Sequence, residues 1–151
     1  MLFFILRLKK MFLLNLLGSR INLTRSYLNS KYENLNSLTN IDLSNKNIQS
    51  IDKDTFRDLN SLKEINLSHN QIESIHYDTF KGLTSLTTIY LNNNNIRSID
   101  RKTFKGLSHL TKVSLLKNQL EDEISLVLEP NLNACIFDIS INFIPNQVNI
   151  N

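Results

Sequence analysis

The 151-residue sequence has a single cysteine, no tryptophan, three glycines and two prolines. Cys135 therefore has no partner for an internal disulfide. With so little glycine and proline, no linker divides the chain into separate domains. Arg7, Lys9 and Lys10 interrupt the apolar N-terminal stretch, so no run reaches the roughly 20 residues of a membrane-spanning helix. Because 41% of the residues are hydrophobic, we expect one domain with its own core.

What the sequence does contain is a pattern that recurs every 24 residues. Near-copies occupy residues 35–58, 59–82 and 83–106, and a looser copy covers 107–130. The copies begin at equivalent leucines, namely Leu35, Leu59, Leu83 and Leu107. A fixed period of this size indicates one supersecondary unit stacked on itself.

Each copy begins with a short alternation of apolar and polar residues. Ile65 and Leu67 are two residues apart and fall on one face of an extended strand, whereas Glu64 and Asn66 face the other way. Equivalent apolar pairs are Ile41/Leu43, Ile89/Leu91 and Val113/Leu115. A single strand cannot bury its apolar face alone, so the pattern predicts stacked strands.

Later positions in each copy predict an inward turn and a second apolar layer. Asn70, Asn94 and Asn118 share one position, where a carboxamide can bond backbone groups left unpaired by the turn. Phenylalanines recur further on and should stack with one another: Phe56, Phe80 and Phe104. Gly82 and Gly106 allow a tight bend between copies.

The pattern LxxLxxLxLxxNxIxxIxxxxFxx resembles the leucine-rich repeat family in its typical 24-residue form, over about residues 20–145. The resemblance implies an α/β-type repeat solenoid, a horseshoe segment with a concave parallel β-sheet and irregular convex turns. It also implies binding as the usual activity. Repeats with the phenylalanine position resemble extracellular receptors and matrix proteins more than intracellular ones. Extracellular members usually carry cysteine-rich caps, which this sequence lacks.

The two ends depart from the pattern. Residues 1–19 are interpreted as a signal peptide, a segment covering the first coil, or the remnant of an earlier repeat. Residues 20–34 are predicted to be a shortened coil, with Ile21 and Leu23 at the strand positions. Residues 131–145 predict a degenerate last strand, and 146–151 form a tail. Lys46 replaces the first asparagine, which weakens the predicted ladder there.

Catalysis and cofactor binding find no support in the sequence. The three histidines, His69, His76 and His109, fall at different phases of the repeat and should not converge. No nucleophile motif or glycine-rich phosphate loop is present, so we predict neither an enzyme nor a cofactor or metal site. The sequons at Asn22 and Asn66 arise easily in such a composition, and we favour no glycan at either. Cys135 is interpreted as a half-buried small side chain.

The concave face is the candidate site, because one exposed position per repeat forms a column across the strands. Three columns are predicted: Arg20, Asn40, Glu64, Thr88, Lys112 and Ile136; Asn22, Asp42, Asn66, Tyr90, Ser114 and Asp138; and Arg25, Asn45, His69, Asn93, Lys117 and Ile141. The residues predicted to bind a partner are Glu64, Asn66, His69, Thr88, Tyr90, Asn93, Lys112, Ser114, Leu116 and Lys117. Leu116, with Ile136 and Ile141, is predicted to form an apolar patch unless the last repeats have shifted inward.

These features favour a non-enzymatic module that binds a protein through its concave face. The alternatives are a structural or intracellular scaffold repeat and a fragment of a larger receptor ectodomain. A net charge of +3, with both signs interleaved, argues against nucleic acid. We expect an extracellular or cell-surface location, with cytoplasm as the alternative, and membrane contact only through the N-terminal segment or a receptor context. Self-association is expected if the apolar C-terminal edge is left uncapped.

Overall fold

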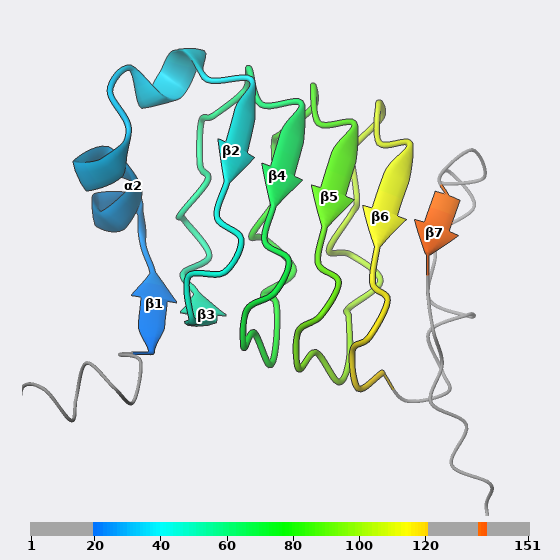
Figure 1. Cartoon of the computed structure of the whole chain (residues 1–151). Coiled ribbons are helices and arrows are strands. Elements are labelled where there is room, and N and C mark those ends of the chain that lie inside the picture. The colour runs from blue at the N-terminus through cyan, green and yellow to red at the C-terminus, as the bar shows by residue number, and fades with distance from the viewer. Residues whose placement is uncertain (1–19, 121–135, 139–151) are drawn as a thin grey trace, which may run out of the picture.

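The computed structural model describes residues 20–120 and 136–138. Within these residues a parallel five-stranded sheet has the order β2-β4-β5-β6-β7, as Figure 1 shows. Its strands are β2 (Asn40–Asp42), β4 (Glu64–Asn66), β5 (Thr88–Tyr90), β6 (Lys112–Ser114) and β7 (Ile136–Asp138). A two-stranded parallel sheet joins β1 (Ile21–Leu23) to β3 (Ile48–Ile51). The helix α2 (Arg25–Lys31) and the 3-10 helix η1 (Leu35–Ser37) lie between β1 and β2 in the chain.

The strands of the large sheet are equivalent in sequence as well as in space. Ile41 pairs with Ile65, Ile65 with Ile89, Ile89 with Val113, and Val113 with Phe137. Each step is therefore 24 residues, which confirms the stacked unit and the predicted strand in the degenerate last repeat. The chain forms a solenoid of stacked coils, with its sheet on the concave side and turns on the convex side, as the resemblance implied.

The predicted asparagine ladder is present. The Asn94 amide donates to the carbonyls of Leu67 and Leu91, at 3.0 Å each, and its Oδ1 accepts from the backbone N–H of Ile72 at 3.0 Å. Asn70 and Asn118 make equivalent bonds one coil before and one coil after. The first position departs as expected: Lys46 is exposed. The ladder therefore starts at Asn70.

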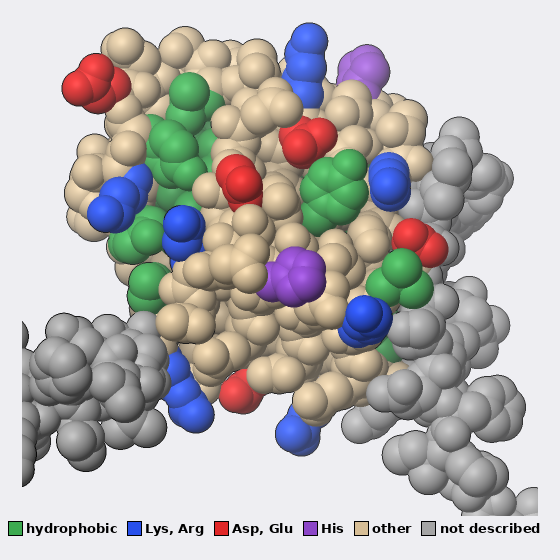
Figure 2. All heavy atoms as spheres, viewed as in Figure 1, with side chains coloured by type: hydrophobic (Ala, Val, Ile, Leu, Met, Phe, Trp, Pro, Cys, Tyr) green, Lys and Arg blue, Asp and Glu red, His purple; other side chains and the backbone are tan. Residues whose placement is uncertain are grey.

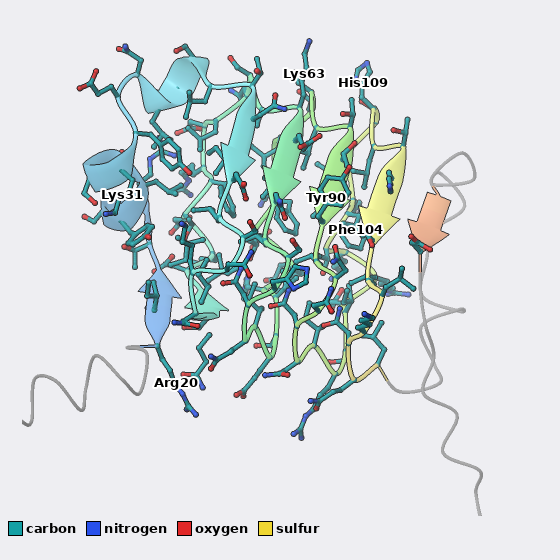
Figure 3. All side chains as sticks on the ribbon, viewed as in Figure 1. Arg20, Lys31, Lys63, Tyr90, Phe104 and His109 are labelled. Atoms are coloured by element: carbon teal, nitrogen blue, oxygen red, sulfur yellow. The ribbon has the colours of Figure 1, made fainter. Side chains whose placement is uncertain are left out.

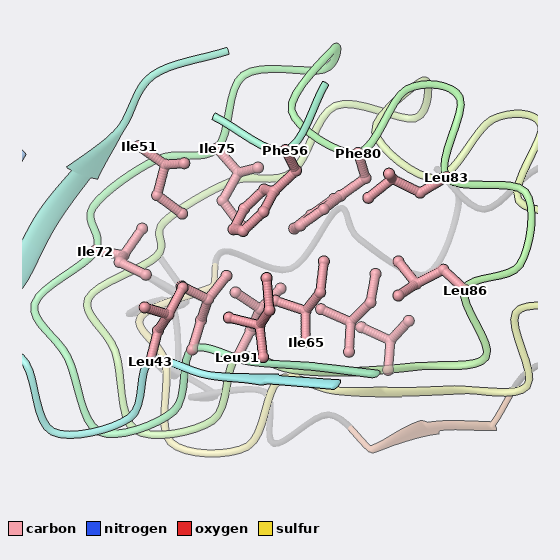
Figure 4. Close-up of a cluster of buried hydrophobic side chains, with 14 of the residues drawn as sticks. Leu43, Ile51, Phe56, Ile65, Ile72, Ile75, Phe80, Leu83, Leu86 and Leu91 are labelled. Carbon is pink, nitrogen blue, oxygen red and sulfur yellow. The ribbon is translucent and has the colours of Figure 1, made fainter. Parts of the chain in front are cut away.

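Two apolar layers fill the space between the sheet and the convex turns. The strand residues Ile65, Leu67 and their equivalents face the rings of the phenylalanine column (Figure 4). The ring centroids of Phe56 and Phe80 are 6.1 Å apart, and those of Phe80 and Phe104 are 6.3 Å apart, both stacked. All three rings are 2% exposed or less, so the repeat buries its second layer by stacking like residues.

The bend after each phenylalanine requires a positive φ. Gly82 and Gly106 adopt φ of 83° and 80°, which glycine accepts without steric cost. Asp58 occupies the same position in the first coil, with φ of 62°. The prediction that glycine serves a tight bend is confirmed, and the first coil makes the same bend with a less suitable residue.

The predicted placement of Ile21 and Leu23 is wrong. They lie in β1, which pairs with β3 on the convex return rather than with the concave strands, with Ile21 against Ile48 and Leu23 against Ile51. A register shift after Ile21 accommodates their shorter spacing. Residues 20–38 therefore supply the second half of a coil.

This half-coil covers the outer edge of β2. Thr24 caps α2 by accepting from the Tyr27 N–H, and Leu28 is fully buried beneath the helix. Tyr32 then donates its hydroxyl to the carbonyl of Asp42 at 2.9 Å. The equivalent carbonyl one coil later is that of Asn66. It accepts from the backbone N–H of Leu43, which lies in the coil before it. Tyr32 thus replaces a backbone donor that a complete preceding coil would supply.

Candidate functional site

The concave face of the large sheet brings most of the predicted residues together. Glu64 lies beside Thr88, and Thr88 beside Lys112, in one row of paired residues. Asp42, Asn66, Tyr90 and Ser114 form the adjacent row. Figure 2 views this face and shows acidic, hydrophobic and basic side chains gathered over the strands.

Tyr90 is the central aromatic residue of this face, where Figure 3 labels it. Its side chain is half-buried on β5, and the Nζ of Lys112 lies 5.2 Å from the centre of its ring. Such a cation over an aromatic face contributes about 0.5–1 kcal/mol at exposed sites. The contact holds two long side chains together, so part of the ordering needed for binding is already present.

A second line of side chains follows the strands, at the point where each coil turns inward. Asn45, His69, Asn93 and Lys117 all have φ of 56°, in the left-handed region. The His69 Nε2 and Asn93 Nδ2 lie 3.4 Å apart. Asparagine tolerates this backbone conformation, whereas for an ordinary residue such as lysine it costs about 1 kcal/mol. We refer to these four residues as the rim.

Some predicted residues are less available than the pattern indicates. Ser114 lies in the correct row but is only 5% exposed. The Asn66 Oδ1 accepts from both the backbone N–H and the hydroxyl of Ser68, at 3.0 and 2.7 Å, which holds its side chain against the sheet. Leu116 is half-buried, and the other members of the predicted apolar patch lie outside the described side chains. The accessible part of the site therefore consists mainly of polar and charged groups around Tyr90.

The charges of this face alternate along the solenoid, with acidic residues on β2, on β4 and, as Asp138, on β7, and a basic residue on β6. Asp42 and Glu64 come from β2 and β4, whereas Lys112 comes from β6 and Lys117 from the rim after it. The Ser44 backbone N–H donates to Asp42 at 2.9 Å and, with the Ser44 side chain, lowers the pKa of Asp42. Asp42 is thus held in its charged form at neutral pH.

Three residues predicted for the columns do not belong to this face. Arg20, Asn22 and Arg25 were assigned with Ile21 and Leu23, and the pairing of β1 with β3 removes them from the concave sheet. Asn22 accepts a hydrogen bond from Ser50 on β3. The Arg25 guanidinium donates to the Arg57 carbonyl at 2.7 Å, which ties α2 to the next coil. The sequon at Asn22 therefore lies away from the concave face.

Sequence reasoning missed Tyr32, whose hydroxyl closes the β2 edge. It also left Asp42 out of the predicted binding set, although it placed Asp42 in the right column. The spacing of the strand motif was the signal for Asp42, because Asp42 aligns with Asn66 and Tyr90.

The histidines have separate surroundings. His69 neighbours Asn93, His76 stacks on Tyr77 with 4.3 Å between ring centres, and His109 has its Nδ1 2.8 Å from the Thr84 carbonyl oxygen. Among the described residues no group of three histidine, cysteine or acidic side chains is arranged to hold a metal ion. Within the same ranges, no helix has the length and apolar character needed to cross a bilayer.

Comparison with known proteins places this geometry in a family. The family profile described as Leucine rich repeat matches residues 36–96 and 84–127. The search of curated proteins found no match to this sequence. Among solved structures, TLR13 in complex with ssRNA13 has a TM-score of 0.64 and 30% identity, over 80% of this chain and 17% of that one.

Two further solved structures match this chain with lower TM-scores. Toll, in its complex with Spatzle from Drosophila, gives a TM-score of 0.56 and 22% identity over 69% of this chain and 15% of that one. The leucine-rich repeat domain of APL1B gives 0.47 and 26%, over 52% and 23%. This chain thus spans less than a quarter of the length of each. It belongs to the leucine-rich repeat family.

Proposed function

We propose that this chain is a non-enzymatic protein-binding module whose concave face recognises a partner protein. The contact set comprises Glu64, Asn66, His69, Thr88, Tyr90, Asn93, Lys112, Ser114, Leu116 and Lys117, extended by Asp42. The observation that carries the proposal is the row of paired strands, which sets one outward side chain per coil beside the next. Leucine-rich repeats generally serve protein interaction, which agrees with this assignment.

The energetics of the face favour binding. The strands are held by backbone pairing and by the asparagine ladder, so presenting these side chains requires little further ordering of the backbone. Tyrosine is enriched among residues that dominate interface energies, because it buries a large area with few rotatable bonds. Tyr90 has that role here, with Lys112 against its ring.

The location we propose is the extracellular space or the cell surface, because two of the similar structures are receptors of the Toll type. The alternative is a scaffold repeat, in cytoplasm or within a longer array, whose concave face binds nothing. The two differ in one property: substitutions on the concave face abolish capture of a partner in the first case and are silent in the second.

The test compares two matched triple variants on an array of purified extracellular proteins. The concave variant is Glu64→Ala, Tyr90→Ala and Lys112→Ala. The convex control, Glu73→Ala, Tyr77→Ala and Lys102→Ala, removes the same residue types, including a lysine 5.9 Å from a tyrosine ring. We expect a protein that binds the parent and the convex variant but not the concave one. Equal capture by all three, with circular dichroism showing all are folded, refutes the concave site, and capture of no protein refutes the function.

A further inference from the structure

We propose that Asn22 is an N-glycosylation site, and that Asn66, the asparagine of the other Asn-X-Ser/Thr motif, carries no glycan. The inference rests on the extracellular location proposed above, because this modification is made on proteins that enter the secretory pathway. Sequence alone favoured no glycan at either asparagine, since the motif arises easily in this composition. The structure separates the two motifs by the surroundings of their side chains.

Asn22 lies in the middle of β1, with its side chain on the outside of the solenoid. Its neighbour Leu23 is fully buried whereas Asn22 is exposed, as the alternation of side chains along a strand requires. β1 lies beside β3 at the N-terminal end of the described chain, on the convex return (Figure 1). A glycan on Asn22 therefore extends into solvent away from the concave strands.

The hydrogen bonds of the Asn22 side chain leave the attachment atom available. Its Oδ1 accepts from the Ser50 hydroxyl at 2.8 Å, which holds the carboxamide in place on β1. Within residues 20–120 and 136–138, no residue forms a hydrogen bond with the Asn22 Nδ2. Replacing one hydrogen of Nδ2 with a sugar therefore breaks no bond of the fold, and Oδ1 keeps its bond to Ser50.

The reaction is a group transfer from a lipid-linked oligosaccharide. The Asn22 Nδ2 forms a bond to the anomeric carbon of the sugar, the bond from that carbon to the diphosphate of the lipid carrier breaks, and one amide proton is released with the lipid diphosphate. Thr24 supplies the hydroxyl that completes the motif. In the folded chain this hydroxyl accepts from the Tyr27 N–H at 3.2 Å, so the motif is presented for transfer before α2 forms.

Asn66 has the same motif in different surroundings. It is half-buried on the concave sheet, between Asp42 on β2 and Tyr90 on β5. Its Oδ1 accepts from both the backbone N–H and the hydroxyl of Ser68, a residue that is only 7% exposed. With strands about 4.8 Å apart, a glycan on Asn66 would press against both neighbours and cover the proposed binding face.

The experiment expresses the full chain behind a cleavable secretory leader in a cultured animal-cell line. The purified protein is treated with peptide N-glycosidase F in water enriched in ¹⁸O, which converts each glycan-bearing asparagine to a labelled aspartate that peptide mass spectrometry locates. We expect a single step in gel mobility on treatment, the label at position 22 and an unlabelled Asn66. If the chain is not exported, translation in the presence of isolated microsomes gives the same readout on the translocated chain.

Two variants remove the first motif without removing the cap of α2. Asn22→Gln retains a carboxamide, and Thr24→Asp destroys the motif while keeping a side chain that caps helices well. Both should migrate like the enzyme-treated parent. Thr24→Ser keeps the motif and the cap and should keep the glycan. Ser68→Ala removes the second motif alone, so it is the matched control and should also keep the glycan.

Two results overturn the inference: a translocated chain without a glycan at position 22, and a label at position 66. The absence of the glycan leaves the proposed function to the protein array, whose variants lie on the concave face. A protein that the array captures should bind the glycosylated parent and Asn22→Gln equally. Capture that the Asn22 glycan blocks would place this glycan on the binding surface and refute its position.

Discussion

Replacing Asn94 with alanine tests whether the asparagine ladder holds the coils together. The loss is unequal among its three bonds. The carbonyls of Leu67 and Leu91 each keep a second amide donor, from Asn70 and Asn118. Within residues 20–120 and 136–138 the Ile72 N–H has the Asn94 Oδ1 as its only acceptor, so the substitution leaves this N–H unpaired in the core.

The magnitude follows from that inequality. An unpaired buried N–H costs about 1–3 kcal/mol, and each of the two shared bonds contributes about 0.5–1 kcal/mol. We therefore expect Asn94→Ala to lower the free energy of unfolding by about 3 kcal/mol, a large share of the roughly 5–15 kcal/mol typical of a domain. Urea denaturation followed by far-ultraviolet circular dichroism measures the change. Asn95→Ala is the matched control, because the Asn95 side chain makes one long contact, of 3.4 Å, to Gln119.

An aspartate at position 94 tests the acceptor role of the Asn94 side chain apart from its donor role. Asn94→Asp keeps an oxygen for the Ile72 N–H but turns a carboxylate toward two carbonyls. Burial and these carbonyls raise the pKa of the new carboxyl in the folded state, so its destabilisation is present at neutral pH and is relieved as the pH falls toward the unfolded value. A loss below about 1 kcal/mol for Asn94→Ala, or a pH-independent Asn94→Asp, refutes the account of the ladder.

Three further predictions use differences between coils. The buried hydroxyl of Thr79 has no partner in the described part of the chain, whereas that of Thr55 donates to the Leu23 carbonyl. In urea denaturation Thr79→Val should therefore stabilise the fold, and Thr55→Val should destabilise it by about 1 kcal/mol. Positions 58 and 82 both require a positive φ, so Asp58→Gly should raise the thermal midpoint and Gly82→Ala should lower it, each by the equivalent of about 1 kcal/mol. An unchanged midpoint in either variant refutes the backbone argument. Because the pKa of Asp42 is lowered in the folded state, its charged form stabilises the fold at pH values above the pKa of the unfolded state. This contribution is lost as the pH falls through the pKa of the folded state, and an ordinary pKa of Asp42 in an NMR titration would contradict the prediction.

The repeat itself could be predicted because the fold requires the same residue types at each step. Ile65 and Asn70 recur at 24-residue intervals, since every coil buries the same apolar face and must satisfy the same backbone groups. The phenylalanine column follows for the same reason. Periodicity therefore carries enough information to place the sheet, the ladder and the convex layer without a structure.

The first coil could not be placed by the same reasoning, because Ile21 and Leu23 fit two positions of the pattern. Their spacing of two matches a concave strand, and a register shift lets it match the wider spacing in β3 as well. The available signal was the number of positions from these residues to the leucine that begins the next copy of the repeat. Fourteen positions separate Ile21 from Leu35, closer to the 11 from Ile48 to Leu59 than to the 18 from Ile41 to Leu59. Tyr32 gave no such signal, since a cap depends on where a side chain reaches in space.

The positions that the fold leaves free are the ones to which we assign the proposed function. Asn40, Glu64, Thr88 and Lys112 have equivalent pairing and differ only in what they expose, so backbone energetics do not choose among them. The rim is different, because its left-handed backbone favours asparagine and yet the fourth coil has Lys117. Lys117→Asn should therefore stabilise the fold by about 1 kcal/mol while weakening binding of an anionic probe. A variant that gains stability and keeps full binding would show that Lys117 is not retained for its charge.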